Sequence, residues 1–196
     1  MIKPSLLEYV ERPPRVAAFF CYTARMHPIY TYTVPVYIKL LGGLRNVLAK
    51  AEAHAKEKGM SEAMFLNDAL APDMFPLKKQ VQLASDHAKG AIARLTGKEN
   101  PKMEDTEATF AELFTRIDKT LMFVQSASEK DFEGAEERKV VLPFREGKYL
   151  TGMEYLLEYG MPNFFFHVVT AYGIVRKNGV QIGKADFING LPLKDL

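Results

Sequence analysis

The sequence lacks the features that several kinds of fold and function require. Its only cysteine, Cys21, cannot form a disulfide within the chain, and no histidine or basic cluster beside it would activate it as a nucleophile. No segment approaches the roughly 18 uninterrupted apolar residues of a membrane-spanning helix, so we expect no membrane insertion. The 26 Lys and Arg residues nearly balance 24 acidic residues, and this net charge of +2 does not favour nucleic acid or an anionic membrane.

What the chain has is sufficient apolar content to fold by itself. Of its 196 residues, 47% are hydrophobic and 26% are charged, which is typical of a globular protein and excludes disorder as the dominant state. The length suits one domain, and we find no internal repeat, low-complexity segment or linker. We therefore expect a cytoplasmic protein with one domain at residues 28–190, an extension at 1–27 and a tail at 191–196.

The amino-terminal extension has some features of a targeting segment. Basic residues precede the short apolar run Val16–Tyr22, but Glu8, Glu11 and two consecutive prolines interrupt the basic region. We interpret residues 1–27 as an extension of the domain. Met26 is an alternative start, because the periodic pattern begins just after it.

Apolar residues recur at helical spacing in four long segments. The pattern predicts helices at about 34–58, 76–95, 106–126 and 151–177. Asp105 or Thr106 can cap the third helix, and Pro162 should kink or break the fourth. The pair Gly42-Gly43 in the first helix indicates close packing against a neighbouring helix. Four amphipathic helices with short connections predict an all-α, four-helix bundle.

Between the third and fourth helices the pattern changes. Lys139–Phe144 and Lys148–Leu150 are two short β-prone runs on either side of Arg145-Glu146-Gly147. Because a glycine-containing turn joins them, we expect a small β-hairpin there.

Histidines are the residues most suited to chemistry. His54, His87 and His167 lie on or beside the apolar stripes of three different helices, whereas His27 precedes the helices. Helical bundles build metal sites from inward side chains on facing helices, and imidazole suits zinc, nickel, iron and copper. Asn163 lies four residues before His167 and shares its helix face. The pattern predicts a metal site at His87, Asn163 and His167, with His54 as the reserve ligand.

Structural explanations compete with this metal site. A buried histidine often bonds a carbonyl or carboxylate, and asparagine is a weak ligand for transition metals. The aromatic residues of the fourth helix suit a packed core, or else an apolar ligand pocket. The chain has no glycine-rich phosphate loop, no G-x-S-x-G turn and no Cys/His spacing for structural zinc.

Several sequence blocks carry a family resemblance. The segment His167–Gly179 resembles the last helix of the DinB/YfiT-like superfamily of four-helix bundles. Leu70–Leu77, Asp86–Ala91 and Pro162–His167 are similar to one branch of it, a domain-of-unknown-function family. The resemblance implies a metal-dependent enzyme. Some members of the superfamily are thiol transferases. It also implies one histidine on the second helix and an H-x-x-x-H pair on the last.

This chain follows the superfamily pattern only in part. His87 matches the second-helix histidine and His167 the later member of the pair, but Asn163 stands where the earlier histidine is expected. A divalent metal (zinc, nickel, manganese or iron) completed by water would suit a thiol-transferase or hydrolase acting on a small-molecule substrate. The alternative is a non-catalytic small-ligand-binding or scaffold module.

Two further expectations concern partners. A helix-turn-helix DNA binder is disfavoured because no predicted helix has a dense Lys/Arg face, so we expect no nucleic-acid partner. Exposed apolar faces and the resemblance favour a homodimer.

Overall fold

The computed structural model describes residues 27–195, and the regular elements in this range are helices and helical turns. The elements in chain order are α1 (Pro28–Glu57), α2 (Glu62–Leu66), α3 (Leu77–Thr96), α4 (Phe110–Gln125), the 3-10 turn η3 (Glu129–Phe132), α5 (Gly152–Glu154), the π-helical turn η4 (Tyr155–Gly160), α6 (Met161–Lys177) and α7 (Lys184–Ile188). The expected targeting features, the Met26 start and Cys21 lie outside the described residues.

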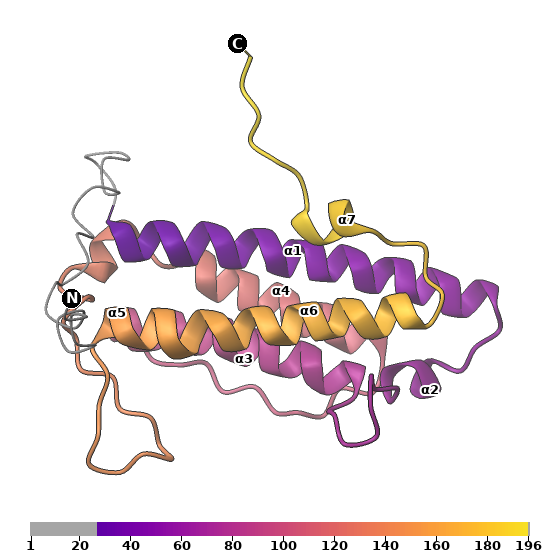
Figure 1. Ribbon diagram of the computed structural model, residues 1–196, viewed down its shortest axis with the longest axis horizontal. Helices are drawn as coiled ribbons and strands as arrows, with labels where there is room; N and C mark the ends of the chain where they lie inside the picture. Colours follow the sequence, from indigo (N-terminus) through magenta and orange to yellow (C-terminus); the bar gives the residue numbers. More distant parts are fainter. Residues whose placement is uncertain (1–26, 196) are drawn as a thin grey trace, which may run out of the picture.

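Four long rods form the predicted bundle. They are α1, α3, α4 and the continuous rod α5–η4–α6, and they lie side by side (Figure 1). Helix α3 packs against α4 and α6, and α1 packs against the same two helices from the opposite corner. The apolar stripes meet in one core, because each amphipathic helix must bury its apolar side against its neighbours.

The glycine pair of α1 has the predicted role. The short helix α7 crosses over α1 (Figure 1), and a Cβ atom at Gly43 would lie 3.1 Å from the carbonyl oxygen of Phe187. A side chain at residue 43 would therefore push α7 away, so glycine permits this close approach.

Two helix starts differ from the sequence prediction. Helix α1 begins at Pro28 rather than near residue 34, because proline fits the first turn, where its missing N–H would be unpaired anyway. Helix α4 begins at Phe110 rather than at Thr106. Thr109 caps it, since its side chain accepts from the Glu112 backbone N–H while Glu112 bonds back to the Thr109 N–H.

The predicted β-hairpin is wrong. Residues 139–150 form a loop at one end of the bundle, and no strand occurs within 27–195 (Figure 1). Val140 and Leu150 alone pair, exchanging backbone hydrogen bonds of 2.8 and 2.9 Å. Pro143 lacks the N–H that a ladder needs, and Phe144 and Tyr149 leave more than half of their surfaces exposed. Val140 and Leu142 are buried, but the chain between them and Leu150 continues neither the hydrogen-bond ladder nor the buried face that a hairpin needs.

The break expected at Pro162 is present as a π-helical turn. Residues 155–160 have the wider π-helical hydrogen bonding just before Pro162, in the first turn of α6. Proline has no backbone N–H to donate within a helix. The π-helical hydrogen bonding gives the carbonyl that this leaves without a donor another partner. Tyr155 and Tyr159 belong to this turn, so the break sets where their rings lie. None of the helices within residues 27–195 combines the length and apolarity of a membrane-spanning segment.

Candidate functional site

The structure brings His87 and His167 together across the contact between α3 and α6. Their ring centres are 5.4 Å apart and the ring planes differ by 17°. His167 is 7% exposed, whereas His87 lies partly exposed at the rim of the contact. The expectation that two helices each contribute an imidazole to one place is thus met by the fold.

Gln80 lies seven residues, about two helical turns, before His87 on α3, and it orients His167. The Gln80 side-chain nitrogen donates to the Phe75 carbonyl oxygen at 2.9 Å, so its oxygen Oε1 faces the imidazole. That oxygen lies 2.8 Å from His167 Nδ1. Because an amide oxygen can only accept, Nδ1 carries the proton. In the neutral ring, Nε2 is then the nitrogen with the free lone pair.

The surroundings favour the neutral form of both imidazoles. Burial, followed by the nearby His167 ring, lowers the pKa of His87 from 6.5 to about 4, although Asp86 acts in the opposite direction. Burial and the Lys79 charge lower the pKa of His167. Neutral imidazole is the form that binds metals or acts as a base.

Asn163 has the position expected from its spacing, but half of its amide is committed. Its Nδ2 donates to the Tyr159 carbonyl oxygen at 2.7 Å, one turn earlier. Its Oδ1 is therefore the side-chain atom left to meet a ligand.

His54 and His27 are not part of this site. A Cβ atom at Gly179 would lie 3.8 Å from His54 Nε2, so His54 sits beside the residue that follows the end of α6. Gly179 is twelve residues beyond His167, about 18 Å along a helix. His54 therefore cannot serve as the reserve ligand. His27 lies 3.2 Å from Glu136 at the other end of the chain's first helix.

The donor set is smaller than the superfamily pattern implies. Within residues 27–195 no group of three or more His, Cys, Asp or Glu side chains could hold a metal ion. The two imidazoles are the donors that the structure brings together at this place.

His87 also lines a polar hollow of about 250 Å³. The other lining residues are Asp86, Lys89, Arg94, Asn100 and Tyr159. The Tyr159 ring centre lies 5.7 Å from that of His87. His87 is thus reached from a cavity that is lined by two cations, one carboxylate and a phenol.

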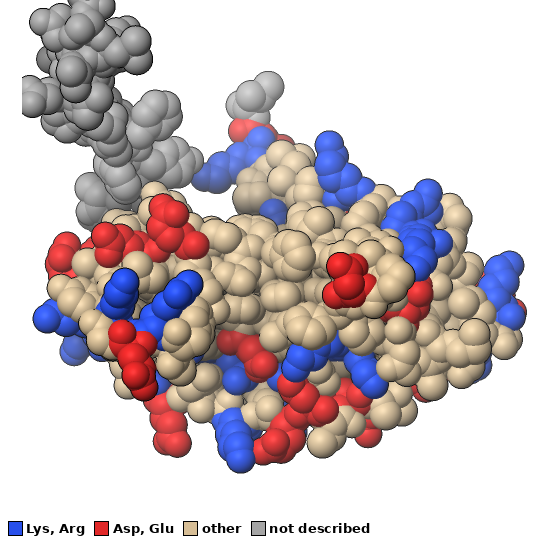
Figure 2. Space-filling view, turned by 60° about the horizontal axis from the view of Figure 1, so that its bottom comes forward, with Lys and Arg blue, Asp and Glu red and all other residues tan. Residues whose placement is uncertain are grey.

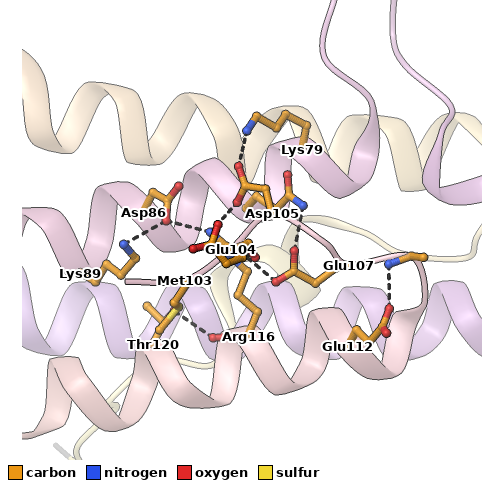
Figure 3. A network of polar contacts seen from close by, with 12 residues as sticks. Lys79, Asp86, Lys89, Met103, Glu104, Asp105, Glu107, Glu112, Arg116 and Thr120 are labelled. Atoms are coloured by element: carbon orange, nitrogen blue, oxygen red, sulfur yellow. Dashed lines mark hydrogen bonds and ion pairs between the residues drawn. The ribbon is translucent and has the colours of Figure 1, made fainter. Parts of the chain in front are cut away.

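A second polar cluster lies between α3 and α4, around Arg116 of α4, and shares Asp86 and Lys89 with the hollow (Figure 3). The Arg116 side chain is almost fully buried, and its two terminal nitrogens contact Glu107, Asp86 and Asp105 at 2.9, 2.8 and 3.0 Å. Burial opposes the charge, yet these three carboxylates together raise the pKa of the guanidinium.

Lysines complete this second cluster. Lys89 lies 3.2 Å from Asp86, and Lys79 lies 2.5 Å from Asp105. The carboxylates of the loop before α4 are thereby shared between cations of α3 and α4 (Figure 3). These ion pairs tie the loop and two helices together, which favours a structural role for the cluster.

Sequence reasoning missed Gln80, Arg94 and Arg116. Gln80 is a polar residue at helical spacing within the apolar stripe of α3, three residues after Leu77, and that interruption was the available signal. Arg116 interrupts the stripe of α4 in the same way. The acidic residues at 104–107 suggested only a favourable helix dipole, and nothing local to them identifies Arg116 as their partner.

The surface charge is mixed in sign. Lys/Arg and Asp/Glu residues are interleaved on the face seen in Figure 2. Many are paired, as Lys177 is with Asp68 at 2.9 Å. A phosphate backbone is bound by unpaired cations in an extended array.

Comparison with known proteins agrees with the sequence resemblance. The family model described as a domain of unknown function (DUF1993) matches residues 29–188. A crystal structure of a DinB family member protein from Shewanella denitrificans is similar at 44% sequence identity, covering 86% of this chain and 96% of that chain, with a TM-score of 0.83. Comparison with curated proteins gives no match. With this extent of similarity, the chain belongs to the DUF1993 family of DinB-like helical bundles.

Proposed function

We propose that this protein binds a divalent transition metal at His87 and His167 and acts on a small-molecule substrate there, as a thiol-transferase or hydrolase. The single observation that carries the proposal is the pairing of two neutral imidazoles from α3 and α6, with ring centres 5.4 Å apart. A zinc-bound nitrogen lies about 2.0–2.1 Å from the ion, so two rings that share an ion have centres within about 6 Å of each other.

Gln80 supports the metal role of His167. A metal-binding histidine commonly donates its second N–H to an oxygen, which fixes the ring and its tautomer. The contact of 2.8 Å between His167 Nδ1 and Gln80 Oε1 has this character. The free lone pair is then held on Nε2 before any ligand arrives, which reduces the entropy lost on binding.

Asn163 would supply the third protein donor through Oδ1, and solvent or substrate the remaining ones. The chemistry that a divalent ion supplies when bound is Lewis acidity, which lowers the pKa of a coordinated water or thiol. The chain's own residues hold the donors in place, and the hollow beside His87 admits substrate.

The second candidate is a small-ligand-binding module without catalysis. It is favoured by the presence of only two imidazoles, with Asn163 at the position of the expected third. In that case the Gln80–His167 bond is a buried polar contact, and its main contribution is to stability.

Thermal unfolding of chelator-treated protein, purified without a nickel column, separates the two. Zinc, nickel, manganese and ferrous ions are added singly. An ion present at about 100 times its Kd adds about 2.7 kcal/mol, which raises Tm by about 5–10 °C for a chain of this size. We expect His167→Ala to abolish this increase.

His54→Ala is the matched control, because His54 lies at the distant end of the bundle. It should keep the full metal-dependent increase in Tm. If no ion stabilises the wild type, or if His167→Ala lowers Tm without changing any metal response, the non-catalytic module is the better description.

A further inference from the structure

We infer that the hollow beside His87 binds a small amphipathic carboxylate, with the carboxylate at Arg94 and the apolar part under the 139–150 loop. The inference deepens the proposed function by naming a substrate class. The role as a substrate rests on that function, whereas binding itself requires no metal.

Arg94 is the first observation. Its guanidinium makes one side-chain hydrogen bond, from Nη1 to the Tyr155 hydroxyl at the long distance of 3.4 Å, and lies 5.7 Å from the centre of that ring. Within the described residues no carboxylate pairs with it. A partly buried guanidinium with most of its five N–H donors unused is suited to bidentate binding of a planar anion.

The other charges of the hollow do not oppose an anion. Lys89 and Arg94 are two cations against one carboxylate, Asp86. Asp86 Oδ1 is already shared by Lys89 at 3.2 Å and Arg116 at 2.8 Å. The charge left uncompensated in the cavity is that of Arg94.

Apolar surface continues from the polar hollow through Tyr159. This residue also lines a second hollow of about 360 Å³ beneath the loop, whose apolar and aromatic lining is Val140, Leu142, Phe144, Tyr149, Leu150 and Tyr159. The remaining lining residues, Arg145 and Lys148, are cations, and no carboxylate is among them.

A row of rings connects the two hollows. The centres of His167 and His87 are 5.4 Å apart, those of His87 and Tyr159 5.7 Å, and those of Tyr159 and Phe144 5.9 Å. The row is a continuous wall from the histidine pair to the apolar hollow. A ligand that extends along it with a carboxylate at Arg94 needs an apolar chain or ring. Binding sites commonly combine such an apolar lining with a few fixed polar groups.

Gly90 accommodates the position of Arg94. A Cβ atom at residue 90 would lie 2.5 Å from Arg94 Nη1, so the guanidinium lies against α3 where a side chain is missing. Gly90→Ala would displace the guanidinium while leaving its charge on the protein. It should not harm α3, because alanine favours a helix more than glycine does.

The test is binding of octanoate to the full chain in the presence of chelator, followed by calorimetry and by Tm. Octanol and inorganic phosphate are the comparison probes. We expect octanoate to bind and raise Tm, and octanol and phosphate to bind at least tenfold more weakly. Arg94→Gln and Gly90→Ala should each weaken octanoate binding about tenfold or more.

Arg176→Gln is the matched control, since Arg176 is exposed beyond the far end of the site and should leave octanoate binding unchanged. Equal binding of octanoate by wild type and by both site variants would overturn the inference. Phosphate binding as tightly as octanoate would also overturn it, because no apolar part would then be recognised. Since metal is absent throughout, the outcome is independent of the metal test.

Discussion

Two polar clusters lie along helix α3 and meet at Asp86 and Lys89, and they differ in whether their charges are already paired. On the α4 side, Arg116 meets three carboxylates within 3.0 Å. On the α6 side, Arg94 meets none within the described residues, and burial lowers the pKa of both histidines. The difference separates a cluster that holds elements together from one that has donors and lone pairs available for a ligand. Buried charge by itself therefore does not indicate a functional site.

The largest effect that this comparison predicts is loss of stability on replacing Arg116. In Arg116→Met the carboxylates of Asp86, Asp105 and Glu107 lose their shared cation, and breaking a buried ion network costs about 3–5 kcal/mol. Urea unfolding measures this change in the free energy of unfolding. The paired but half-exposed Arg45 is the control, because Arg45→Met loses its contacts with Asp118 and with the Phe114 ring and should cost only about 0.5–2 kcal/mol. Similar losses in the two variants would contradict the structural role of Arg116.

The next largest effect is on the α6 side, where a substitution should change ligand affinity more than stability. Gln80→Leu removes the oxygen that fixes His167 Nδ1, and loss of such a contact typically weakens metal binding 10–100-fold. Competition with a chromophoric chelator measures the zinc Kd. Gln80→Glu keeps an acceptor for Nδ1 but loses the donor to the Phe75 carbonyl oxygen, so it should weaken zinc binding less than Gln80→Leu does. Unchanged zinc binding by Gln80→Leu would mean that His167 is not held for a metal.

The smallest effect is a pH dependence of stability. Burial and His167 lower the folded-state pKa of His87 from 6.5 to about 4. Between these values the unfolded chain binds a proton at residue 87 that the folded chain does not, so the free energy of unfolding falls as the pH falls. We expect metal-free protein to be about 1–2 kcal/mol less stable at pH 5 than at pH 7.

The variant His87→Asn isolates this contribution. Urea unfolding of the variant at both pH values should show a smaller difference than the wild type, with the lowered pKa of His167 accounting for the rest. Carboxylates such as Asp105 and Asp131, whose pKa values are lowered from 3.8, contribute only at more acidic pH. Identical pH dependence in wild type and variant would show that His87 is not desolvated by folding.

The histidine pair was predictable from the sequence, because its members lie at or beside apolar stripes of helices that must face one another. The spacing of Asn163 and His167 likewise follows from the helical repeat. The partner Gln80 was not identified, although its side chain breaks the stripe of α3. Its role depends on the rotation of α3 against α6, which no local pattern specifies.

The charged residues show most clearly which contacts a local sequence pattern does not predict. Glu107 and Asp105 precede α4, and the local pattern explains them as acidic residues near a helix start. Their partner Arg116 lies nine residues beyond Glu107, and Lys79 comes from α3. Only the path of the loop across both helices brings these groups together. The hairpin prediction failed for a related reason, because Pro143 and the exposure of Phe144 and Tyr149 outweigh local β preference.

The sequence by itself determined the helices, most of their ends and the bundle, because helical periodicity and capping act over a few residues and an amphipathic helix has few ways to bury its apolar side. It also determined that two imidazoles lie on helices able to meet. Tertiary structure alone decided which charges are paired and which remain open. Pairing depends on distances of a few ångströms between segments far apart in the chain, and these are set by how the helices rotate and how the loops cross them.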